Sequence, residues 1–137
     1  MKKSSGYRVL DANYNRLREA LRVCEDVNRF VLSSNALAIS CKRLRHRVTK
    51  LILSMPITYR EIVSTRDSEN DCGRRSFMMD KKKEHIRDVF IRNVKRAEEA
   101  TRVIEEFTKL IDVKIAFQFQ KIRFGIYDLE KKTIAKL

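Results

Sequence analysis

The sequence predicts an all-α fold, an antiparallel four-helix bundle built from a duplicated helical hairpin with a long connector between the two copies. Apolar residues recur at three- and four-residue intervals along four segments, which is the period of amphipathic helices. Only three glycines and one proline interrupt the 137 residues, so long helices are favoured over short strands. A chain of this length can build one core, and we expect residues 1–137 to form one domain.

An internal repeat is the third observation behind this prediction. Residues 13–26 (NYNRLREALRVCED) and 93–106 (NVKRAEEATRVIEE) are identical at seven of fourteen positions, where chance would give about one. The identical pairs are Asn13/Asn93, Arg16/Arg96, Glu19/Glu99, Ala20/Ala100, Arg22/Arg102, Val23/Val103 and Glu25/Glu105. A shorter match aligns residues 43–48 with 121–126, so that Arg45 corresponds to Arg123. The two hairpins span about 9–56 and about 82–136.

The first hairpin contains two helices with one apolar stripe each. Ser33 or Ser34 can cap the N-terminus of the second helix, and Pro56 must end it. The first stripe comprises Leu10, Leu17, Ala20, Leu21, Cys24, Val27 and Val31. The second stripe comprises Leu37, Cys41, Leu44, Val48, Leu51 and Met55.

The second hairpin follows a connector at 57–81, the one long irregular stretch that the pattern predicts. Its first helix is expected from about Lys82 to Leu110, and Asp112 can cap the second. The stripe of that last helix comprises Ile115, Phe119, Ile122, Ile126 and Leu129. Short turns near 33–35 and 111–113 make neighbouring helices antiparallel.

The net charge of +13 indicates an anionic partner or substrate. The charge alone does not choose among nucleic acid, an acidic membrane and phosphorylated small molecules. A nucleic-acid-binding module usually gathers its basic residues on one face, whereas here acidic residues are interspersed with them. No signal peptide and no membrane-spanning stretch are expected. Three widely spaced cysteines without a CxxC pattern predict neither a zinc site nor disulfides, and they favour the cytoplasm.

Two asparagines occupy equivalent places within apolar stripes. Asn13 lies in line with Leu17 and Cys24, and Asn93 is its repeat partner. A buried amide without a hydrogen bond costs about 1–3 kcal/mol. We therefore expect the two amides either to face one another or a shared ligand, or to form a structural pair that sets the register of the helices.

Arginines border the apolar stripes and are candidates for binding phosphate. Arg16 and Glu19 flank the first stripe and recur as Arg96 and Glu99. Arg45 and Arg123 border their own stripes in the same way. Guanidinium groups bind phosphate oxygens in a bidentate manner. The alternative is that these residues form i,i+3 ion pairs and cover the edges of the core.

The connector carries a dense polar segment, residues 66–74 (RDSENDCGR). Asp67 and Asp71 could hold Mg²⁺, while Arg66 and Arg74 contact phosphate oxygens. The alternative is a solvated polar turn. The sequence contains none of the familiar glycine-rich nucleotide-binding motifs, and the two histidines are isolated.

Five stretches in order resemble the hydroxymethylpyrimidine phosphate kinase family of thiamin biosynthesis. They are RVLDANYNRLREALRVCEDVNRF, CKRLRH, RDSENDCGR, NVKRAEEATRVIEEF and IRFGIYDLE, and together they run through most of the chain. Members of this family occur alone or as the N-terminal domain of fusions to thiamin-phosphate synthase, and this chain resembles the stand-alone form. Gln120 and Gly125 stand where basic residues are typical.

The resemblance implies an ATP- and Mg²⁺-dependent phosphotransferase that converts 4-amino-5-hydroxymethyl-2-methylpyrimidine phosphate to the diphosphate. It implies catalytic roles for Arg66, Asp67, Asp71 and Arg74, with the two aspartates as metal ligands. The residues expected to bind substrate are Asn13, Arg16, Glu19, Lys42, Arg45, Asn93, Arg96 and Arg123. The alternatives are a basic nucleic-acid-binding module and a non-catalytic accessory domain of a thiamin-phosphate synthase.

The last helix carries a second apolar set roughly opposite its core stripe. Val113, Phe117 and Phe124 belong to it, and Ile39 stands at the position equivalent to Phe117. A helix that is apolar on two sides needs two neighbours, so we expect a homodimer. The alternative is that the connector folds back over these side chains. Its apolar residues are Ile57, Tyr59, Ile62, Val63 and Phe77.

Overall fold

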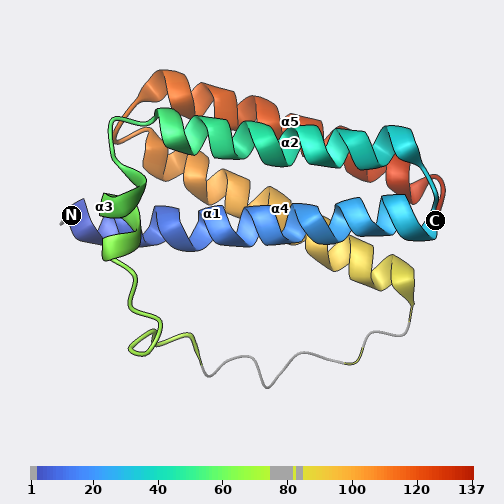
Figure 1. Ribbon diagram of the computed structural model, residues 1–137, viewed down its shortest axis with the longest axis horizontal. Coiled ribbons are helices and arrows are strands. Elements are labelled where there is room, and N and C mark those ends of the chain that lie inside the picture. Colours follow the sequence, from blue (N-terminus) through green and yellow to red (C-terminus); the bar gives the residue numbers. More distant parts are fainter. Residues whose placement is uncertain (1–2, 75–81, 83–84) are drawn as a thin grey trace.

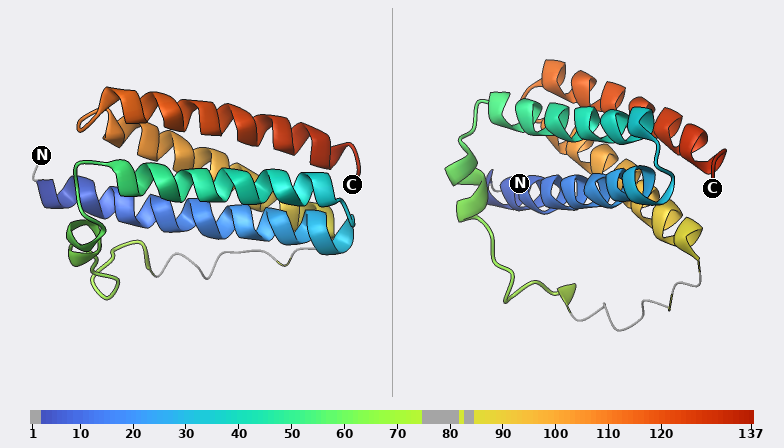
Figure 2. Two further views of the ribbon diagram at one scale, coloured as in Figure 1. Left: turned by 45° about the horizontal axis from the view of Figure 1, so that its top comes forward. Right: turned by 45° about the vertical axis from the view of Figure 1, so that its right-hand side comes forward.

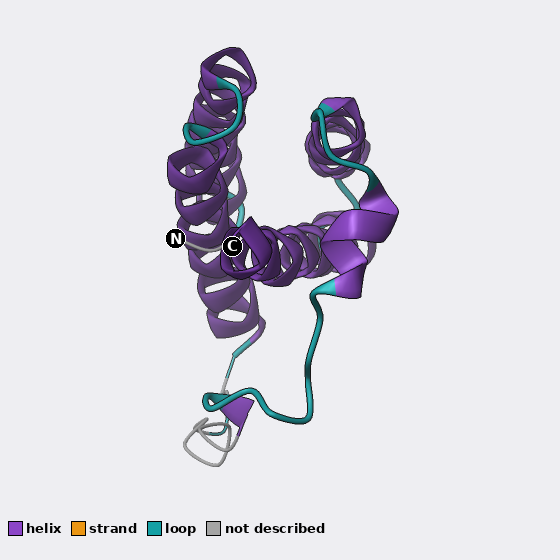
Figure 3. Ribbon diagram, turned by 90° about the vertical axis from the view of Figure 1, so that its left-hand side faces the viewer, coloured by secondary structure: helices purple, strands orange, loops and turns teal. Residues whose placement is uncertain are grey.

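The computed structural model describes residues 3–74, 82 and 85–137 as helices and loops, and this part of the chain contains no strand (Figure 3). The helical elements are α1 (Lys3–Asp26), η1 (Val27–Val31), α2 (Asn35–Ser54), α3 (Tyr59–Ser64), α4 (Ile86–Thr108) and α5 (Val113–Ile134). The predicted all-α bundle is confirmed. None of these helices is apolar over a length that could cross a membrane.

The long helices form a ring in which each packs on two neighbours. α1 lies against α2 and α4, and α5 lies against the same two helices. Neighbours run antiparallel, and the ends of the chain lie at opposite ends of the bundle (Figure 1). α3 and the connector after it lie on the side of α1, away from α2 and α5 (Figure 2). All four long helices contribute side chains to one core, which includes Leu17, Ile52, Ile104 and Phe119.

Helix ends follow from capping side chains. The Ser34 hydroxyl accepts a hydrogen bond from the Leu37 N–H at 3.4 Å, and α2 ends two residues before Pro56. Asp112 accepts from the N–H groups of Lys114 and Ile115, so both predicted caps are confirmed. The sequence predicts that this helix begins at about Lys82, but α4 begins at Ile86. The chain is still irregular at Lys82.

The turn of the first hairpin is wider than that of the second. The π-helical segment η1 follows α1 directly, and Ser33 has a positive φ of 50°. Asn28, fully buried within η1, donates hydrogen bonds to the Cys24 carbonyl at 3.0 Å and to the Thr133 hydroxyl at 3.2 Å. This turn is thereby fastened to the C-terminal part of α5.

Gly125 marks the close approach of α5 to α2. A Cβ atom placed on Gly125 would lie 3.0 Å from Cδ2 of Leu44, which is tighter than ordinary van der Waals contact. The sequence predicts that this glycine weakens the last helix, and helix propensity supports a cost of about 1 kcal/mol relative to alanine. The structure supplies the reason for the glycine, because the two helices pack without a side chain at this position.

A pair of acidic residues, one buried and one partly exposed, lies between α4 and α5. Glu98 is buried, and its carboxylate shares the Lys95 ammonium with Glu130, at 3.2 Å from Glu98 and 2.9 Å from Glu130. Oε1 of Glu98 has no hydrogen-bond partner within the described residues. Burial, and then the neighbouring Glu130, raise the pKa of Glu98 to about 7. Glu98 therefore takes up a proton as the pH falls through the neutral range.

Replacing Glu98 by glutamine is expected to stabilise the protein at pH 8 and to change its stability little at pH 5. The pKa of Glu98 in the folded chain is about 7 and exceeds its ordinary value of 4.5. The stability that the protonated form contributes is therefore present below about pH 4.5 and lost as the pH rises through 7. The gain at pH 8 should be of order 1–3 kcal/mol. Urea denaturation at both pH values measures it.

The matched control is Glu99→Gln, which changes the same charge at an exposed neighbouring position. It should move the free energy of unfolding by less than about 0.5 kcal/mol at either pH. Equal effects of the two substitutions at pH 8 would contradict the assignment of the titration to Glu98.

Candidate functional site

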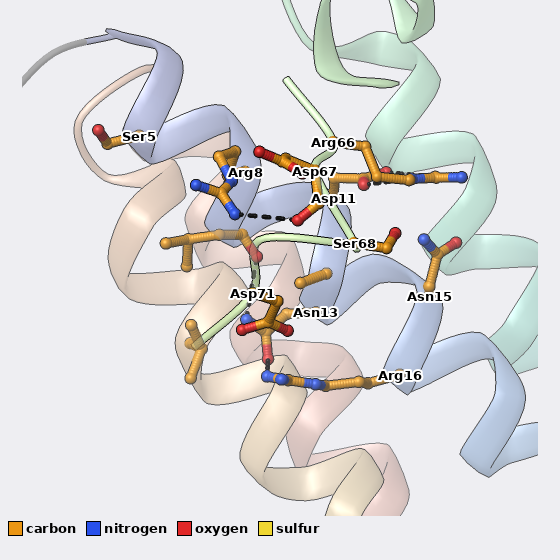
Figure 4. A pocket seen from close by; sticks show the side chains of 13 residues that line it. Ser5, Arg8, Asp11, Asn13, Asn15, Arg16, Arg66, Asp67, Ser68 and Asp71 are labelled. Carbon is orange, nitrogen blue, oxygen red and sulfur yellow. Dashed lines mark hydrogen bonds and ion pairs between the residues drawn. The ribbon is translucent and has the colours of Figure 1, made fainter. Parts of the chain in front are cut away.

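A pocket of about 630 Å³ lies between the N-terminal half of α1 and the connector that follows α3. Charged and amide side chains surround it, and Val103 of α4 lies at its margin (Figure 4). Its lining residues are Ser5, Arg8, Val9, Asp11, Ala12, Asn13, Asn15, Arg16, Arg66, Asp67, Ser68, Asp71 and Val103. Five of the predicted site residues therefore meet in one place: Asn13, Arg16, Arg66, Asp67 and Asp71.

An ion pair fixes the connector to α1. Nε and Nη2 of Arg66 each donate to one carboxylate oxygen of Asp11, both at 2.7 Å. The Asp11 side chain is 4% exposed, so this bidentate pair is shielded on the α1 side. Arg8 adds a weaker hydrogen bond of 3.4 Å to the Asp67 carbonyl. Two of the three nitrogens of Arg66 thus position the loop, whereas the sequence predicts that this residue contacts phosphate.

Asp67 and Asp71 are the exposed carboxylates of the anchored loop that line the pocket. Asp67 accepts hydrogen bonds from the backbone and side chain of Asn70, which holds the pKa of its carboxyl below its usual value. Asp71 accepts from the Gly73 N–H at 3.0 Å. Each carboxylate keeps lone pairs that these hydrogen bonds do not occupy. The described residues contain no group of three or more metal-binding side chains, so the loop offers a partial coordination shell.

Such a shell fits Mg²⁺ better than metals that need a complete protein cage. Mg²⁺ is typically held by one or two carboxylates together with water and substrate phosphates. The pair Asp67 and Asp71 matches this donor set, and it lines the same pocket as Arg8 and Arg16.

The two asparagines occupy different surroundings. Asn13 and Asn93 each donate to the carbonyl four residues earlier, Val9 at 2.9 Å and Val89 at 2.8 Å. Asn13 lines the pocket beside Val103, which is ten residues along α4 from Asn93. At 1.5 Å per residue, Asn93 lies about 15 Å along α4 from Val103. Of the two asparagines, only Asn13 lines the pocket.

The repeat places an arginine–glutamate–arginine cluster in each hairpin. In the first hairpin, Nη2 of Arg45 lies 3.1 Å from Glu25, and Nη1 of Arg22 lies 3.7 Å from the same carboxylate. In the second, Nε of Arg123 lies 2.9 Å from Glu105, whose other neighbour is Arg102 at 3.6 Å. Both glutamates are buried.

These contacts give Arg45 and Arg123 internal partners, where the sequence predicts that they bind substrate. The third nitrogen of Arg123 donates to the Tyr127 hydroxyl at 3.0 Å. Arg45 lines a separate hollow together with Glu19. Lys42 and Arg96 are exposed on α2 and α4, outside the pocket.

Arg74 lies next to the pocket and does not line it. Its Nη1 donates to the Ser68 carbonyl at 3.4 Å, which closes the loop on itself.

Among the charged and amide residues that line the pocket, sequence reasoning missed three, Arg8, Asp11 and Asn15. Asp11 follows the core residue Leu10, and a buried acid at such a place signals an unseen cation. That cation, Arg66, lies 55 residues away, and a contact of this range leaves no periodic pattern.

Comparison with known proteins gives one family and a set of related chains. Residues 8–132 match the model of the ThiD2 family. A thiamine-phosphate synthase of Nostoc punctiforme is 38% identical over 129 residues, which cover 93% of this chain and 35% of the synthase. The thiamine-phosphate synthase of Synechocystis is 36% identical over 124 residues, covering 90% of this chain and 34% of that protein. No solved structure gives a significant match.

The chain thus spans about a third of the length of the curated relatives it matches. The matched stretch includes both hairpins and the anchored loop, because it begins at residue 8 and ends at residue 132.

Proposed function

The chain belongs to the ThiD2 family, and from this premise we propose that it is an ATP- and Mg²⁺-dependent kinase of 4-amino-5-hydroxymethyl-2-methylpyrimidine phosphate. The related chains named thiamine-phosphate synthase connect it with thiamin biosynthesis. The observation that supports the proposal best is the pocket on α1, where three arginines and two exposed aspartates lie around one space.

Phosphorylating a phosphate requires two polyanions to approach each other. A phosphate oxygen of the pyrimidine substrate attacks the γ-phosphorus of ATP, a new P–O bond forms, and the bond to the β-phosphate oxygen breaks to release ADP. The nucleophile is already anionic, so no general base is needed. Positive charge and positioning therefore supply most of the catalysis. Arg8 and Arg16 provide charge on the α1 side, and the Arg66–Asp11 pair positions the loop.

Asp67 and Asp71 would hold Mg²⁺, whose chemistry is to neutralise charge on the phosphate oxygens when it is bound. Aspartate carboxylates are ionised at neutral pH, and the hydrogen bonds from Asn70 lower the pKa of Asp67 further. Asn70 and the Gly73 N–H orient the two side chains.

The direct test incubates the purified chain with the pyrimidine monophosphate, ATP and MgCl₂ and follows the products by ³¹P NMR. We expect stoichiometric pyrimidine diphosphate and ADP, and neither product when EDTA is present. Absence of the diphosphate at saturating concentrations of both substrates would contradict the proposal.

The second candidate is a non-catalytic accessory domain of a thiamine-phosphate synthase. The observation that favours it is the extent of the match, because this chain aligns with only about a third of the length of each of these synthases. This candidate predicts no ADP formation but a measurable association with a separate synthase chain. Sedimentation velocity of the mixture, run beside the kinase assay, separates the two functions.

Replacing Asn13 by leucine is expected to weaken binding of the pyrimidine phosphate while keeping or raising stability. An aminopyrimidine offers adjacent donor and acceptor atoms, which a carboxamide can match in a bidentate manner. The leucine removes a buried amide whose hydrogen bonds are to Val9 and, at 3.4 Å, to Arg16 of its own helix. Calorimetric titration should show at least about a tenfold rise in Kd.

The repeat provides the control, Asn93→Leu. Asn93 makes the same hydrogen bond to its own helix, yet it does not line the pocket. If Asn13→Leu binds the pyrimidine phosphate normally and is simply less stable, the amide has a structural role.

We also propose that the protein is a homodimer formed through α5. Val113, Phe117 and Phe124 are 55–60% exposed, and Ile39 is 37% exposed. The described part of the connector does not cover them, because Ile57 and Ile62 are buried in the core and the loop follows α1. Phe77 lies outside the described residues.

Light scattering tests this assembly. The wild type should have twice the 16.2 kDa mass of one chain, and Phe117→Glu should reduce it, because a carboxylate opposes burial of this face. The control is Phe30→Glu, an equally exposed aromatic on η1. A wild-type mass near 16.2 kDa at micromolar concentration would contradict the dimer.

A further inference from the structure

A second hollow adjoins the pocket along the outer face of α1. It has a volume of about 390 Å³ and is lined by Asn15, Arg18, Glu19, Arg22 and Arg45. Asn15 lines both spaces, so the two lie next to each other at this residue. Three of its five lining side chains are arginines, and none of these three belongs to the first pocket.

The arginines of the hollow are not fully neutralised by the protein. Glu25 is shared between Arg45 and Arg22, so one carboxylate faces two guanidinium groups. Arg18 lies over the Tyr14 ring, with its guanidinium carbon 5.7 Å from the ring centroid. Nε of Arg18 is buried and has no hydrogen-bond partner among the described residues. A buried donor without a partner is costly, and a bound anion would satisfy it.

At the equivalent positions of the second hairpin, the charged side chains neutralise each other within the protein. In the repeat alignment Asn15 corresponds to Lys95, and Arg18 corresponds to Glu98. There the cation and the acid sit one helical turn apart and bind each other, with Glu130 as a third member. The first hairpin has a neutral amide and an arginine instead. Its equivalent site therefore has no acid at the position of Glu98, and Glu19, which also lines the hollow, forms no ion pair with Arg18 in the described structure.

We propose that this hollow binds the polyphosphate chain of the nucleoside triphosphate, with Arg18 and Arg22 as the anion-binding residues. The proposal rests on the proposed kinase function for the identity of the ligand, while the anion site itself rests on the geometry above. A polyphosphate here would extend toward the first pocket past Asn15. The γ-phosphate would then approach the pyrimidine phosphate held beside Arg16.

The experiment measures binding of inorganic tripolyphosphate, and separately of ATP, by calorimetry at fixed ionic strength. Arg18→Gln and Arg22→Gln should each raise the Kd for both ligands at least about tenfold, the loss expected for one charge-assisted hydrogen bond. Arg102→Gln is the matched control. Arg102 is the repeat partner of Arg22, is 54% exposed against 55%, and also lies beside a buried glutamate. It should change either Kd less than about twofold.

Three results would overturn the proposal. Equal weakening in Arg22→Gln and Arg102→Gln would mean that the ligands respond to net charge alone. Unchanged binding in both Arg18→Gln and Arg22→Gln would exclude the hollow as the site. Displacement of tripolyphosphate by a short DNA, but not by ATP, would assign the hollow to nucleic acid.

The kinase assay is read independently of these titrations. If tripolyphosphate binding depends on Arg22 but the chain forms no pyrimidine diphosphate, the anion site is supported and the kinase function is contradicted. If the chain is an active kinase and neither Arg18→Gln nor Arg22→Gln changes its affinity for ATP, the kinase function is supported and the anion site is contradicted.

Discussion

Asp71→Asn is expected to lower the rate of phosphoryl transfer at least about a hundredfold while leaving the fold intact. Asparagine keeps the oxygen that accepts from the Gly73 N–H but loses the negative charge that would hold Mg²⁺. Asp67→Asn should act in the same way, because its oxygen can still accept from Asn70. Both residues are exposed, so the melting temperature should stay within a few degrees. Steady-state rates at several Mg²⁺ concentrations measure the effect.

Asp128→Asn is the control for this pair. Asp128 is an exposed aspartate of α5 that contacts only Lys132 in the described structure, and it lies outside the pocket. Its replacement changes the same charge and should leave the rate within about twofold. Near-normal turnover in both loop variants at saturating Mg²⁺ would show that neither carboxylate binds the metal.

Glu105→Gln is expected to lower the free energy of unfolding by about 3–5 kcal/mol, the usual cost of breaking a buried ion pair from one side. Its carboxylate is 3% exposed and bonds Arg123, which is itself only 11% exposed. The substitution leaves that guanidinium without a countercharge in the packed interface of α4 and α5. Glu25→Gln should have a similar effect through Arg45, whose side chain is 8% exposed. Chemical denaturation measures both.

Glu106 supplies the comparison one residue away. It is 44% exposed and pairs with Arg102 and Lys109 on the helix surface. Glu106→Gln should cost less than about 1 kcal/mol, as exposed ion pairs do. Losses below about 1 kcal/mol for both buried glutamates would mean that packing, and not charge pairing, holds the hairpins together.

The sequence predicts the helices well because their signals are local. Apolar spacing and the caps at Ser34 and Asp112 each depend on residues within one or two turns, and the structure confirms them. The start of α1 lies earlier than the predicted residue 9, at Lys3. Residues before Leu10 carry few apolar side chains, so the stripe alone could not show that helix continues there.

The site is predicted less completely, for two physical reasons. The pairing of Arg66 with Asp11 joins segments that only the tertiary fold brings together. Arg45 and Arg123 carry the side chain that commonly binds phosphate. Whether such a guanidinium contacts a ligand or an internal carboxylate depends on the residues of the facing helix. The partner residues Glu25 and Glu105 were visible as repeat pairs, and their shared burial shows why they recur.

The wide first turn also bears on how the two halves diverged. Glu25 and Arg45 are 20 residues apart (45 − 25), whereas Glu105 and Arg123 are 18 apart (123 − 105), yet both pairs meet. An insertion or deletion of two residues after the duplication accounts for the difference, and η1 with the left-handed Ser33 accommodates the longer version. The two repeats thus keep the register of the ion pairs although their turns differ in length. Loop grafting at 29–33 should therefore be tolerated, provided that Asn28 is retained.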